Sequence, residues 1–459
     1  DLTTLVGNEG TSGDKVDLKA DVAITVSDTG SVAAADLTTI NGVTANLVTA
    51  TNIATVTGTS SALNTLAGNE GTSGDKVNLK TDVLVTVSDG TTTAAELNTI
   101  NGMTTGLVTA TAVATVSGSA SDLNTLAGVE GTSGDAVDLK ADVLVTVNDG
   151  TTTAAQLNTI NGMTTALVTA TAVSTVSGAV SDLTTLAGVE GDSGNAVDLA
   201  AGVAITVTDT GAVDSADLNT INGVTTGLVT ATDVATINGT ASAITTLLAA
   251  EGTSGDKVAL DTDFAMTVSS GTATVDQANT MAAFSTSGAI TATISETDIV
   301  TLDDLTTSSA DQLTITVAST SATVAQLTTV AGATGLNVTA TAVETVTGTA
   351  TEMDALLAAE GTTGDKVNLD SDYNITISGS NATVTQANAY GAATDGVVTA
   401  TISDQTIAAL DDLTTSNSDQ LTVTVASTSA TAAQLTTVAG ATGLNVTATA
   451  VETVTGTAT

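Results

Sequence analysis

Aliphatic and polar residues alternate in many short segments of this chain. The segment 16–26, VDLKADVAITV, alternates strictly over eleven residues, which is typical of one strand, or of two strands bent at Ala20-Asp21, with one wet face. The segment 107–116, LVTATAVATV, places Val108, Ala110, Ala112, Ala114 and Val116 on one face. Both patterns predict strands with a narrow aliphatic inner face.

A second pattern predicts short helices. In residues 88–118, Thr93 and Glu96 are spaced as a capping box, and Leu97 and Ile100 fall on one helical face. Asn101-Gly102 then supplies a residue suited to a left-handed helix stop. The fullest form of this motif is S/T-x-x-D/E-L-x-T-L/I. Its central apolar residue falls at Leu2, Leu37, Leu63, Leu97, Leu123, Leu157, Leu183, Leu218 and Ile244, and weaker matches fall at Ala278, Ile299, Leu327, Met353, Ala387, Ile407 and Leu435. We therefore expect sixteen coils, each of roughly 30 residues or slightly fewer, which is within the usual range for solenoid repeats.

The chain is an internal repeat. VTAT begins at residues 48, 108, 168, 229, 338, 398 and 446, with ITAT at 290, and EGTSGD or a variant begins at Glu9, Glu70, Glu130, Glu190, Glu251 and Glu360. These spacings predict a region 1–250 of ~60-residue units with two coils each. A continuous region 251–459 follows, with ~109-residue units of four coils each. Both ends interrupt a repeat, so we expect a segment of a longer chain.

The predicted fold class is a repeat solenoid of stacked coils, with mainly parallel β-strands and short helical corners. One such coil cannot bury its apolar face, whereas stacked coils share a continuous core. The chain has no Pro, as expected if each strand donates amides to the next coil. The absence of Pro and Trp argues against a string of immunoglobulin-like sandwiches. We expect each VTAT strand to occupy the same place in every second coil.

The amino-acid composition argues against several classes of function. Seven Lys, no Arg and 49 carboxylates give a formal charge of −42, which argues against nucleic acid or an anionic membrane as a partner. No apolar run is long enough for a membrane span, so we expect no membrane insertion. The chain lacks His and Cys, which removes the usual catalytic triads and dyads. A paired-carboxylate hydrolase stays chemically possible, but the carboxylates recur at repeated positions, so we expect no enzyme.

The acidic turns are the main candidate for chemistry. They are rich in Gly and carboxylates, and calcium prefers oxygen ligands in flexible loops, although neither an EF-hand nor the calcium-binding nonapeptide is present. The candidate calcium ligands are Glu9, Asp14, Glu70, Asp75, Glu130, Asp135, Glu251 and Asp256, with Glu190, Glu360 and Asp365 in the equivalent turns. Asp28, Asp89 and Asp149 lie in a second set of turns. The alternative is a solvated acidic surface, with equivalent carboxylates in vertical files about 10 Å apart.

The T-x-T strands allow another interpretation. Regular Thr arrays on a flat solenoid face are typical of ice-binding proteins. Here we expect the arrays on every second coil only, with gaps between them, so the favoured explanation is that Thr is a good strand former on a wet face.

The phrases TVSGSASDLNTLAG and TAAELNTING, which alternate with strands such as VDLKADVLVTV, resemble those of the very large repetitive cell-surface proteins of marine cyanobacteria. This resemblance implies an extracellular or cell-surface location, a structural or adhesive role, and dependence on calcium. We expect part of a filament, surface layer or giant surface fibre that associates with itself end to end or side by side. The alternative is an adhesin whose acidic or Thr-rich face binds a glycan, a mineral or a cell surface.

Overall fold

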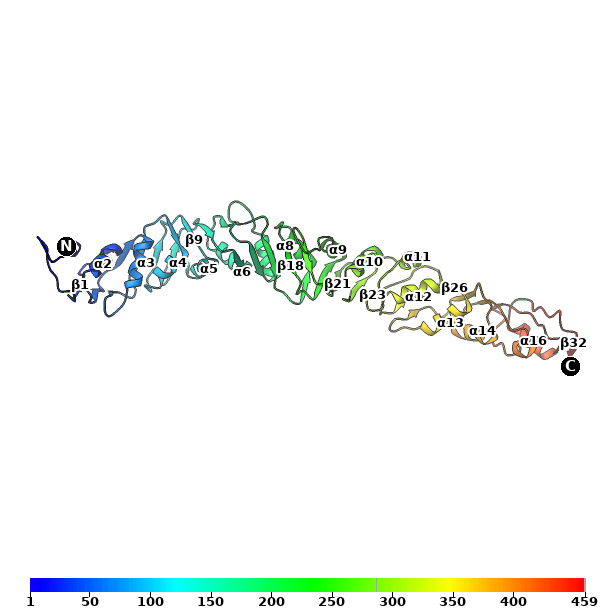
Figure 1. Ribbon diagram of the computed structural model, residues 1–459. Coiled ribbons are helices and arrows are strands. Elements are labelled where there is room, and N and C mark those ends of the chain that lie inside the picture. The colour runs from blue at the N-terminus through cyan, green and yellow to red at the C-terminus, as the bar shows by residue number, and fades with distance from the viewer. Residues whose placement is uncertain (286, 458–459) are drawn as a thin grey trace. The chain divides into compact units, whose positions relative to one another are not determined.

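A computed structural model describes residues 1–285 and 287–457, and the chain divides into two compact bodies. The first body contains Asp1–Thr210, Asp217–Asp233 and Ala250–Leu260, and the second contains Gly211–Ala216, Val234–Ala249 and Asp261–Thr459. In each body, short helices alternate with short parallel strands in successive coils (Figure 1). Each coil has about 30 residues, the size of a typical solenoid repeat. This arrangement confirms the predicted solenoid.

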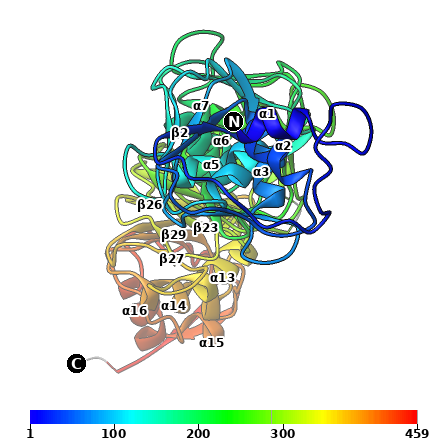
Figure 2. The same ribbon diagram turned by 90° about the vertical axis from the view of Figure 1, so that its left-hand side faces the viewer.

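The described residues contain sixteen helices, and every predicted helical motif lies in one of them. The helices are α1 (Leu2–Gly7), α2 (Ala34–Asn41), α3 (Ser60–Asn69), α4 (Ala94–Asn101), α5 (Ala120–Val129), α6 (Ala154–Gly162), α7 (Val180–Ala187), α8 (Ser215–Asn222), α9 (Ala241–Ala249), α10 (Val275–Phe284), α11 (Ile299–Leu302), α12 (Val324–Gly332), α13 (Ala350–Ala359), α14 (Val384–Ala393), α15 (Ile407–Leu410) and α16 (Ala432–Gly440). In the first body, α2 to α7 pack each against the next, so that they form one column, which Figure 2 shows from the end.

The N-terminus of α4 forms the hydrogen bonds that its sequence predicts. Thr93 Oγ1 accepts the amide of Glu96 at 3.2 Å, and Glu96 Oε2 accepts the amide of Thr93 at 3.2 Å, so the predicted capping box is confirmed. Leu97 and Ile100 are fully buried. The predicted left-handed stop is wrong, because Gly102 has φ −62° and continues the right-handed turn.

The strands form parallel ribbons that run across successive coils. Ribbon 1 contains β1 (Ile24–Thr25), β3 (Val48–Ala50) and β5 (Val77–Leu79). Ribbon 2 contains β2 (Ser31–Ala33), β4 (Thr55–Gly58), β6 (Leu84–Val87), β8 (Val108–Ala110) and β10 (Val137–Leu139). Ribbon 3 contains β7 (Thr91–Thr93), β9 (Thr115–Gly118), β11 (Leu144–Val147), β13 (Val168–Ala170) and β15 (Val197–Leu199). Ribbon 4 contains β12 (Thr151–Thr153), β14 (Thr175–Gly178), β16 (Ala204–Val207), β18 (Val229–Ala231) and β20 (Val258–Leu260).

The second body continues the same construction. Ribbon 5 contains β17 (Ala212–Asp214), β19 (Thr236–Thr240), β21 (Ala265–Ser270), β22 (Ile290–Thr293) and β23 (Gln312–Thr314). Ribbon 6 contains β24 (Ser321–Thr323), β26 (Thr345–Gly348), β28 (Asn374–Ile377), β29 (Val398–Thr401) and β30 (Gln420–Thr422). Two shorter pairs are β25 (Val338–Thr339) with β27 (Val367–Asn368), and β31 (Ser429–Thr431) with β32 (Thr453–Thr455).

The segment 107–116 differs from its prediction. It forms β8 and then β9, with a turn at residues 111–112 between them. After the turn Val113 is fully buried, whereas Ala112 and Ala114 are exposed, so the predicted single face is wrong beyond Ala110. The bend expected at Ala20-Asp21 is confirmed by a turn at those residues.

The pairing register does not follow the period of the sequence repeat. In ribbon 3, Thr92 pairs with Val116, and Val116 pairs with Val145. Thr152, the equivalent of Thr92 in the next repeat, lies further along the chain than Val145 and pairs in ribbon 4. Consecutive strands of one coil start close together, at Val137 for β10 and at Leu144 for β11. Each repeat is therefore displaced by one strand position relative to the ribbons.

This displacement corrects the expected role of VTAT. The strands that carry it in the first body, β3, β8, β13 and β18, lie in ribbons 1, 2, 3 and 4 respectively. They do not stack on each other. Instead β8 pairs with β6, which carries LVTV, and with β10, which carries VDL. The inner residues Val56, Val85, Val108 and Val137 still form a continuous, fully buried file, because each of these different strands supplies a Val at that level.

In several coils, a buried Thr between the helix and the following strand bonds to the preceding coil. Thr104 Oγ1 donates to the carbonyl of Val83 at 2.6 Å and accepts the amide of Gly106 at 2.9 Å. We call this arrangement the Thr staple. It recurs at Thr44, Thr164, Thr225, Thr334, Thr394 and Thr442. Each staple satisfies two backbone groups where the chain passes from a helix to a strand.

We expect the substitution Thr104→Val to lower the free energy of unfolding by about 1–3 kcal/mol, because it leaves the Val83 carbonyl and the Gly106 amide without this partner in a buried place. Urea denaturation measures the change, and hydrogen exchange should become faster at the Gly106 amide, which loses its acceptor. Thr111→Val, at an exposed position in the following turn, is the control. Equal effects of the two substitutions would contradict the staple's role.

Candidate functional site

Each acidic turn is a closed loop. Glu70 forms a parallel bridge with Val77, and the amide of Gly71 donates to the carbonyl of Val77 at 3.1 Å. Gly74 has φ 75°, a conformation that requires glycine in practice, and the equivalent Gly13, Gly134, Gly194, Gly255 and Gly364 have φ between 70° and 74°. The second Gly of EGTSGD is therefore needed for the shape of the loop.

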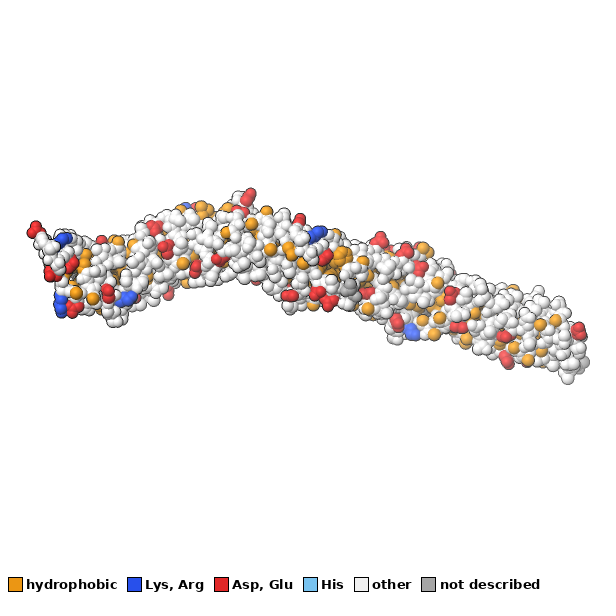
Figure 3. Space-filling model, viewed as in Figure 1, with side chains coloured by type: hydrophobic (Ala, Val, Ile, Leu, Met, Phe, Trp, Pro, Cys, Tyr) orange, Lys and Arg blue, Asp and Glu red, His pale blue; other side chains and the backbone are white. Residues whose placement is uncertain are grey.

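The Lys of these turns does not neutralise the neighbouring Asp. Lys76 Nζ donates to the carbonyl of Gly68 at 2.7 Å, at the C-terminal end of α3, where a cation is favourable. Lys15 and Lys366 make the same bond to Gly7 and Ala358. These Lys side chains thus bond to a helix end rather than to the Asp beside them, and Figure 3 shows acidic side chains spread over the visible face with few basic ones.

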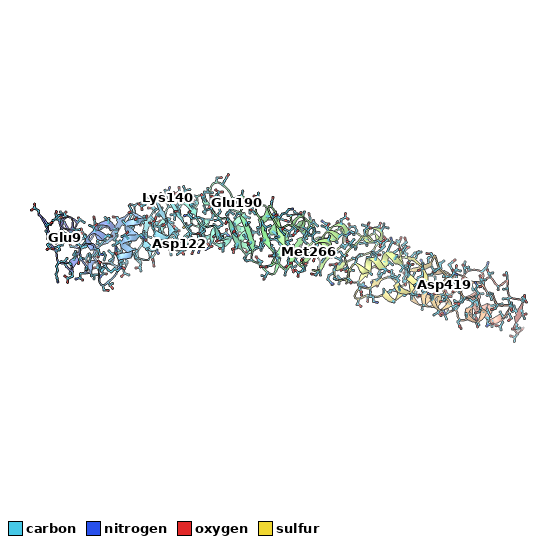
Figure 4. All side chains as sticks on the ribbon, in the orientation of Figure 1. Glu9, Asp122, Lys140, Glu190, Met266 and Asp419 are labelled. Atoms are coloured by element: carbon cyan, nitrogen blue, oxygen red, sulfur yellow. The ribbon has the colours of Figure 1, made fainter. Side chains whose placement is uncertain are left out.

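Equivalent carboxylates of successive repeats do not form ladder files. Val77, at the end of one turn, pairs in ribbon 1, and Val137, at the end of the next, pairs in ribbon 2. The predicted vertical files stay a prediction, because they do not depend on ladder pairing. Figure 4 labels Glu9 and Glu190 at separate places along the first body.

Carboxylates of two successive acidic turns lie close together instead. Glu190 of one turn and Asp256 of the following turn line a single pocket together with Asn222. Asp135 lines a similar pocket with Asn101, and Asp75 accepts the side-chain amide of Asn41 at 3.1 Å. No three His, Cys, Asp or Glu side chains within residues 1–285 and 287–457 are grouped so that they could hold a metal ion. The calcium ligands predicted at Glu9, Asp14, Glu70, Asp75, Glu130, Asp135, Glu251 and Asp256 all stay a prediction.

The second set of turns has a structural role that the sequence did not reveal. Asp149 Oδ2 accepts the amide of Ala120, the first residue of α5, at 2.6 Å. Asp89 does the same for Ser60 of α3, accepting its amide at 2.5 Å and its hydroxyl at 2.6 Å. Asp209 repeats the contact for Val180 of α7. Each carboxylate therefore caps a helix that begins 29 residues upstream, where a negative charge is favourable.

Two carboxylates of the second body are buried and were also missed. Asp311 Oδ1 accepts the amide of Ile290 at 2.9 Å, and its Oδ2 accepts the amide of Ser308 at 2.8 Å. Asp419 makes the equivalent bonds to Val398 and Ser416. The signal available in the sequence was the repeated stretch LTTSSADQLT, which returns as LTTSNSDQLT at residues 413–422. Both carboxylates satisfy backbone amides that would otherwise be buried without partners.

Burial and one hydrogen bond set the pKa of Glu360. Burial raises this pKa above its ordinary value, and a hydrogen bond from Tyr373 Oη at 3.2 Å lowers it in part. The Tyr373 hydroxyl is itself buried, which raises its pKa, and the Glu360 charge raises it further. Tyr390 is similarly buried and donates to the carbonyl of Ala350 and to Asp354.

Threonine hydroxyls form continuous files on the outer face of the ribbons. In ribbon 2, Thr57 pairs with Thr86, and Thr86 pairs with Thr109. The gap predicted at every second coil is therefore wrong, because LVTV and TVTG strands supply Thr between the VTAT strands. The file ends at Asp138, which pairs with Thr109. It is thus short and bordered by charge.

Comparison with protein-family models, with curated proteins and with solved structures finds no match. No helix in the described part of the chain has the length and apolar character needed to cross a membrane. The function must therefore be argued from the geometry alone.

We expect Asp149→Ala to lower the free energy of unfolding by about 1 kcal/mol, because α5 loses the acceptor at its first amide. Denaturant unfolding followed by circular dichroism measures the loss. Asp142→Ala is the matched control, since that carboxylate is exposed and contacts Lys140 at 3.0 Å on the surface. If the control destabilises the chain as much as Asp149→Ala does, the capping role is wrong.

We expect the stability contributed by Glu360 to fall as pH rises through its folded-state pKa. The raised pKa means that the folded chain binds more protons than the unfolded chain just above the ordinary Glu value, so ionisation opposes folding there. Tyr373→Phe removes the hydrogen bond that lowers this pKa and should raise it further. Carbon-13 NMR titration of the carboxyl group measures both values. Glu360→Gln should remove this contribution to the pH dependence of stability, and an unchanged Glu360 pKa in Tyr373→Phe would contradict the assignment.

Proposed function

We propose that this chain is a segment of a structural repeat protein, part of an extracellular filament, surface layer or giant cell-surface fibre, with a mechanical and non-catalytic role. The observation that carries the proposal is the bonding between coils. Parallel ladders, Thr staples and Asp caps each link one coil to its neighbour and recur along both bodies. Such nearest-neighbour interfaces are the source of stability in repeat proteins, and they suit a chain that transmits force along its stack.

The acidic surface supports the same proposal. The excess of carboxylates keeps the coils apart from other anionic surfaces at low ionic strength and is largely screened in salty water. An extracellular, saline environment fits this charge. Calcium is the ion that we propose for the acidic turns, because their ligands are oxygens.

Self-association, end to end or side by side, is part of the proposal. Val454 of β32 is 56% exposed, whereas the equivalent Val116 and Val346 of other coils are fully buried. A further coil stacked on β32, from a continuation of the same chain or from a second chain, would bury Val454 in the same way.

A second candidate function is adhesion. The file of Thr57, Thr86 and Thr109, with half-exposed Leu84 in the same ribbon, presents hydroxyl and methyl groups at the strand spacing. A surface of this kind could contact a glycan, a mineral or a cell surface. The structural role is favoured because the bonds between coils recur along both bodies, whereas this file spans only a few strands.

The proposal predicts that the purified chain associates in a concentration-dependent way and forms fibres in negative-stain electron micrographs. Val454→Asp should reduce the association measured by sedimentation velocity, because it places a charge in the contact. Val300→Asp is the control, since Val300 is 65% exposed but lies in α11 within the stack. A wild-type chain that stays monomeric at all concentrations, or an equal loss with both variants, would overturn end-to-end assembly.

A further inference from the structure

The seven Lys are the only residues of this chain after which a trypsin-like protease cuts, because the chain has no Arg. Four of them lie in acidic turns and are followed by Val, namely Lys15, Lys76, Lys257 and Lys366. A protease of this class binds the Lys side chain in a pocket and places the Lys carbonyl oxygen in its oxyanion hole. The bond can therefore be cut only where this carbonyl is free and the chain beside it is accessible.

Three of these Lys-Val bonds are held by the coil before them. In each, an amide of the preceding coil donates to the Lys carbonyl, at 2.9 Å from Val48 to Lys76, at 2.9 Å from Val229 to Lys257 and at 2.8 Å from Val338 to Lys366. The Val that follows each Lys is fully buried, at residues 77, 258 and 367. A protease can reach these bonds only after the two coils separate.

The same bond is open at Lys15. Val16 is 44% exposed, and residues 11–17 are all exposed. Val16 forms a bridge with Glu9 of its own turn, and no hydrogen bond to the Lys15 carbonyl is found within residues 1–285 and 287–457. Exposed loop tips with small and polar residues are the preferred sites of proteolytic nicking. The first acidic turn thus has the properties of a cleavage site that the later turns lack.

The Lys side chain does not cause this difference. Lys15, Lys76 and Lys366 each donate Nζ to a carbonyl at the end of the preceding helix, at 2.7 Å in all three turns. The side chains are therefore held alike, whereas the backbone of Lys15 is free and that of the other two is not.

Two more exposed Lys side chains separate the two explanations. Lys80 and Lys140 have side chains that are 55% and 52% exposed. Their carbonyls nevertheless accept the amides of Val83 and Val143, both at 3.0 Å, and these two Val are fully buried. A protease could extend either turn only by pulling a Val out of the core. If the backbone controls cleavage, neither turn is cut.

We propose that the Lys15–Val16 bond is a cleavage site for a serine endoprotease that prefers Lys, and that the bonds after Lys76, Lys257 and Lys366 are latent sites closed by the preceding coil. Hydrolysis breaks the bond between the Lys carbonyl carbon and the Val nitrogen, and one water supplies the hydroxyl to the carbon and the hydrogen to the nitrogen. Cleavage in an acidic turn therefore reports that no coil is packed before it. This inference does not depend on the structural role proposed above.

Digestion of the folded full chain with trypsin tests the proposal, with the products identified by mass spectrometry. We expect the first product to begin at Val16, to lose residues 16–19 once the turn is open, and otherwise to stay intact. Cleavage after Lys76, Lys257 and Lys366 should be at least about tenfold slower, because it requires transient opening between coils. Lys15→Gln should abolish the first product and leave the other rates unchanged.

A second variant tests the bonds that close a latent site. Asn337 Nδ2 donates to the carbonyl of Lys366 at 2.9 Å and to that of Gly361 at 2.7 Å. Asn337→Ala should therefore make cleavage after Lys366 about two- to tenfold faster. The matched control is Asn445→Ala, because Asn445 has the same place in the later copy of LNVTATA and is exposed. Circular dichroism and an unchanged rate at Lys257 verify that the fold is kept.

Three results would overturn the proposal. Resistance at Lys15, or cleavage after Lys76 or Lys366 at the rate seen after Lys15, would mean that the preceding coil does not decide access. Cleavage that starts after Lys80 or Lys140 would mean that exposure of the Lys side chain decides it. Equal rates at Lys366 in the two Asn variants would mean that hydrogen bonds to the carbonyl do not close the site.

Discussion

The register of the parallel ladders is the constraint on which the rest of the structure depends. Each inner strand must meet one partner in the coil before it and one in the coil after it, as Val145 meets Val116 and Val168. The sequence repeats over two coils but falls one strand position out of step with the ladders, so a strand of the first body pairs with a different sequence rather than with its own copy. The core stays continuous because strands of several sequences, such as TVTG, LVTV and VTA, all place Val at the same inner level. The different strands of one repeat must therefore fit against each other, whereas a strand does not need to fit against its own copy.

Polar groups in this fold mainly connect one coil to the next. Thr104 hydrogen-bonds to two backbone groups of adjacent coils, and Asp149 accepts the first amide of a helix in the preceding coil. A core of Val, Leu, Ile and Ala supplies little directional bonding, so these contacts fix how one coil lies on another. The scarcity of large aromatic side chains is thereby offset by many repeated hydrogen bonds. This explains why a chain that is so rich in Thr and Asp can fold as a stack.

The sequence predicted what local interactions determine. The capping box at Thr93 and the apolar pair Leu97 and Ile100 located α4, and the same motif located the other helices. The alternation of apolar and polar residues gave a wrong strand face where a turn reverses it, as at residues 111–112, because a period of two does not reveal a corner. It also could not assign Asp149 or the neighbour of Asn222, since their partners lie in other coils and depend on the ladder register. Long-range pairing is the information that a single sequence lacks.

The displacement of each repeat by one strand position has a consequence for recognition. Neighbouring coils present different strand sequences side by side, as β8 with VTA lies between β6 with LVTV and β10 with VDL. A partner that binds across adjacent coils therefore meets unlike strands. Only a partner whose binding groups are spaced over two coils would meet the same sequence again and gain avidity from the repetition.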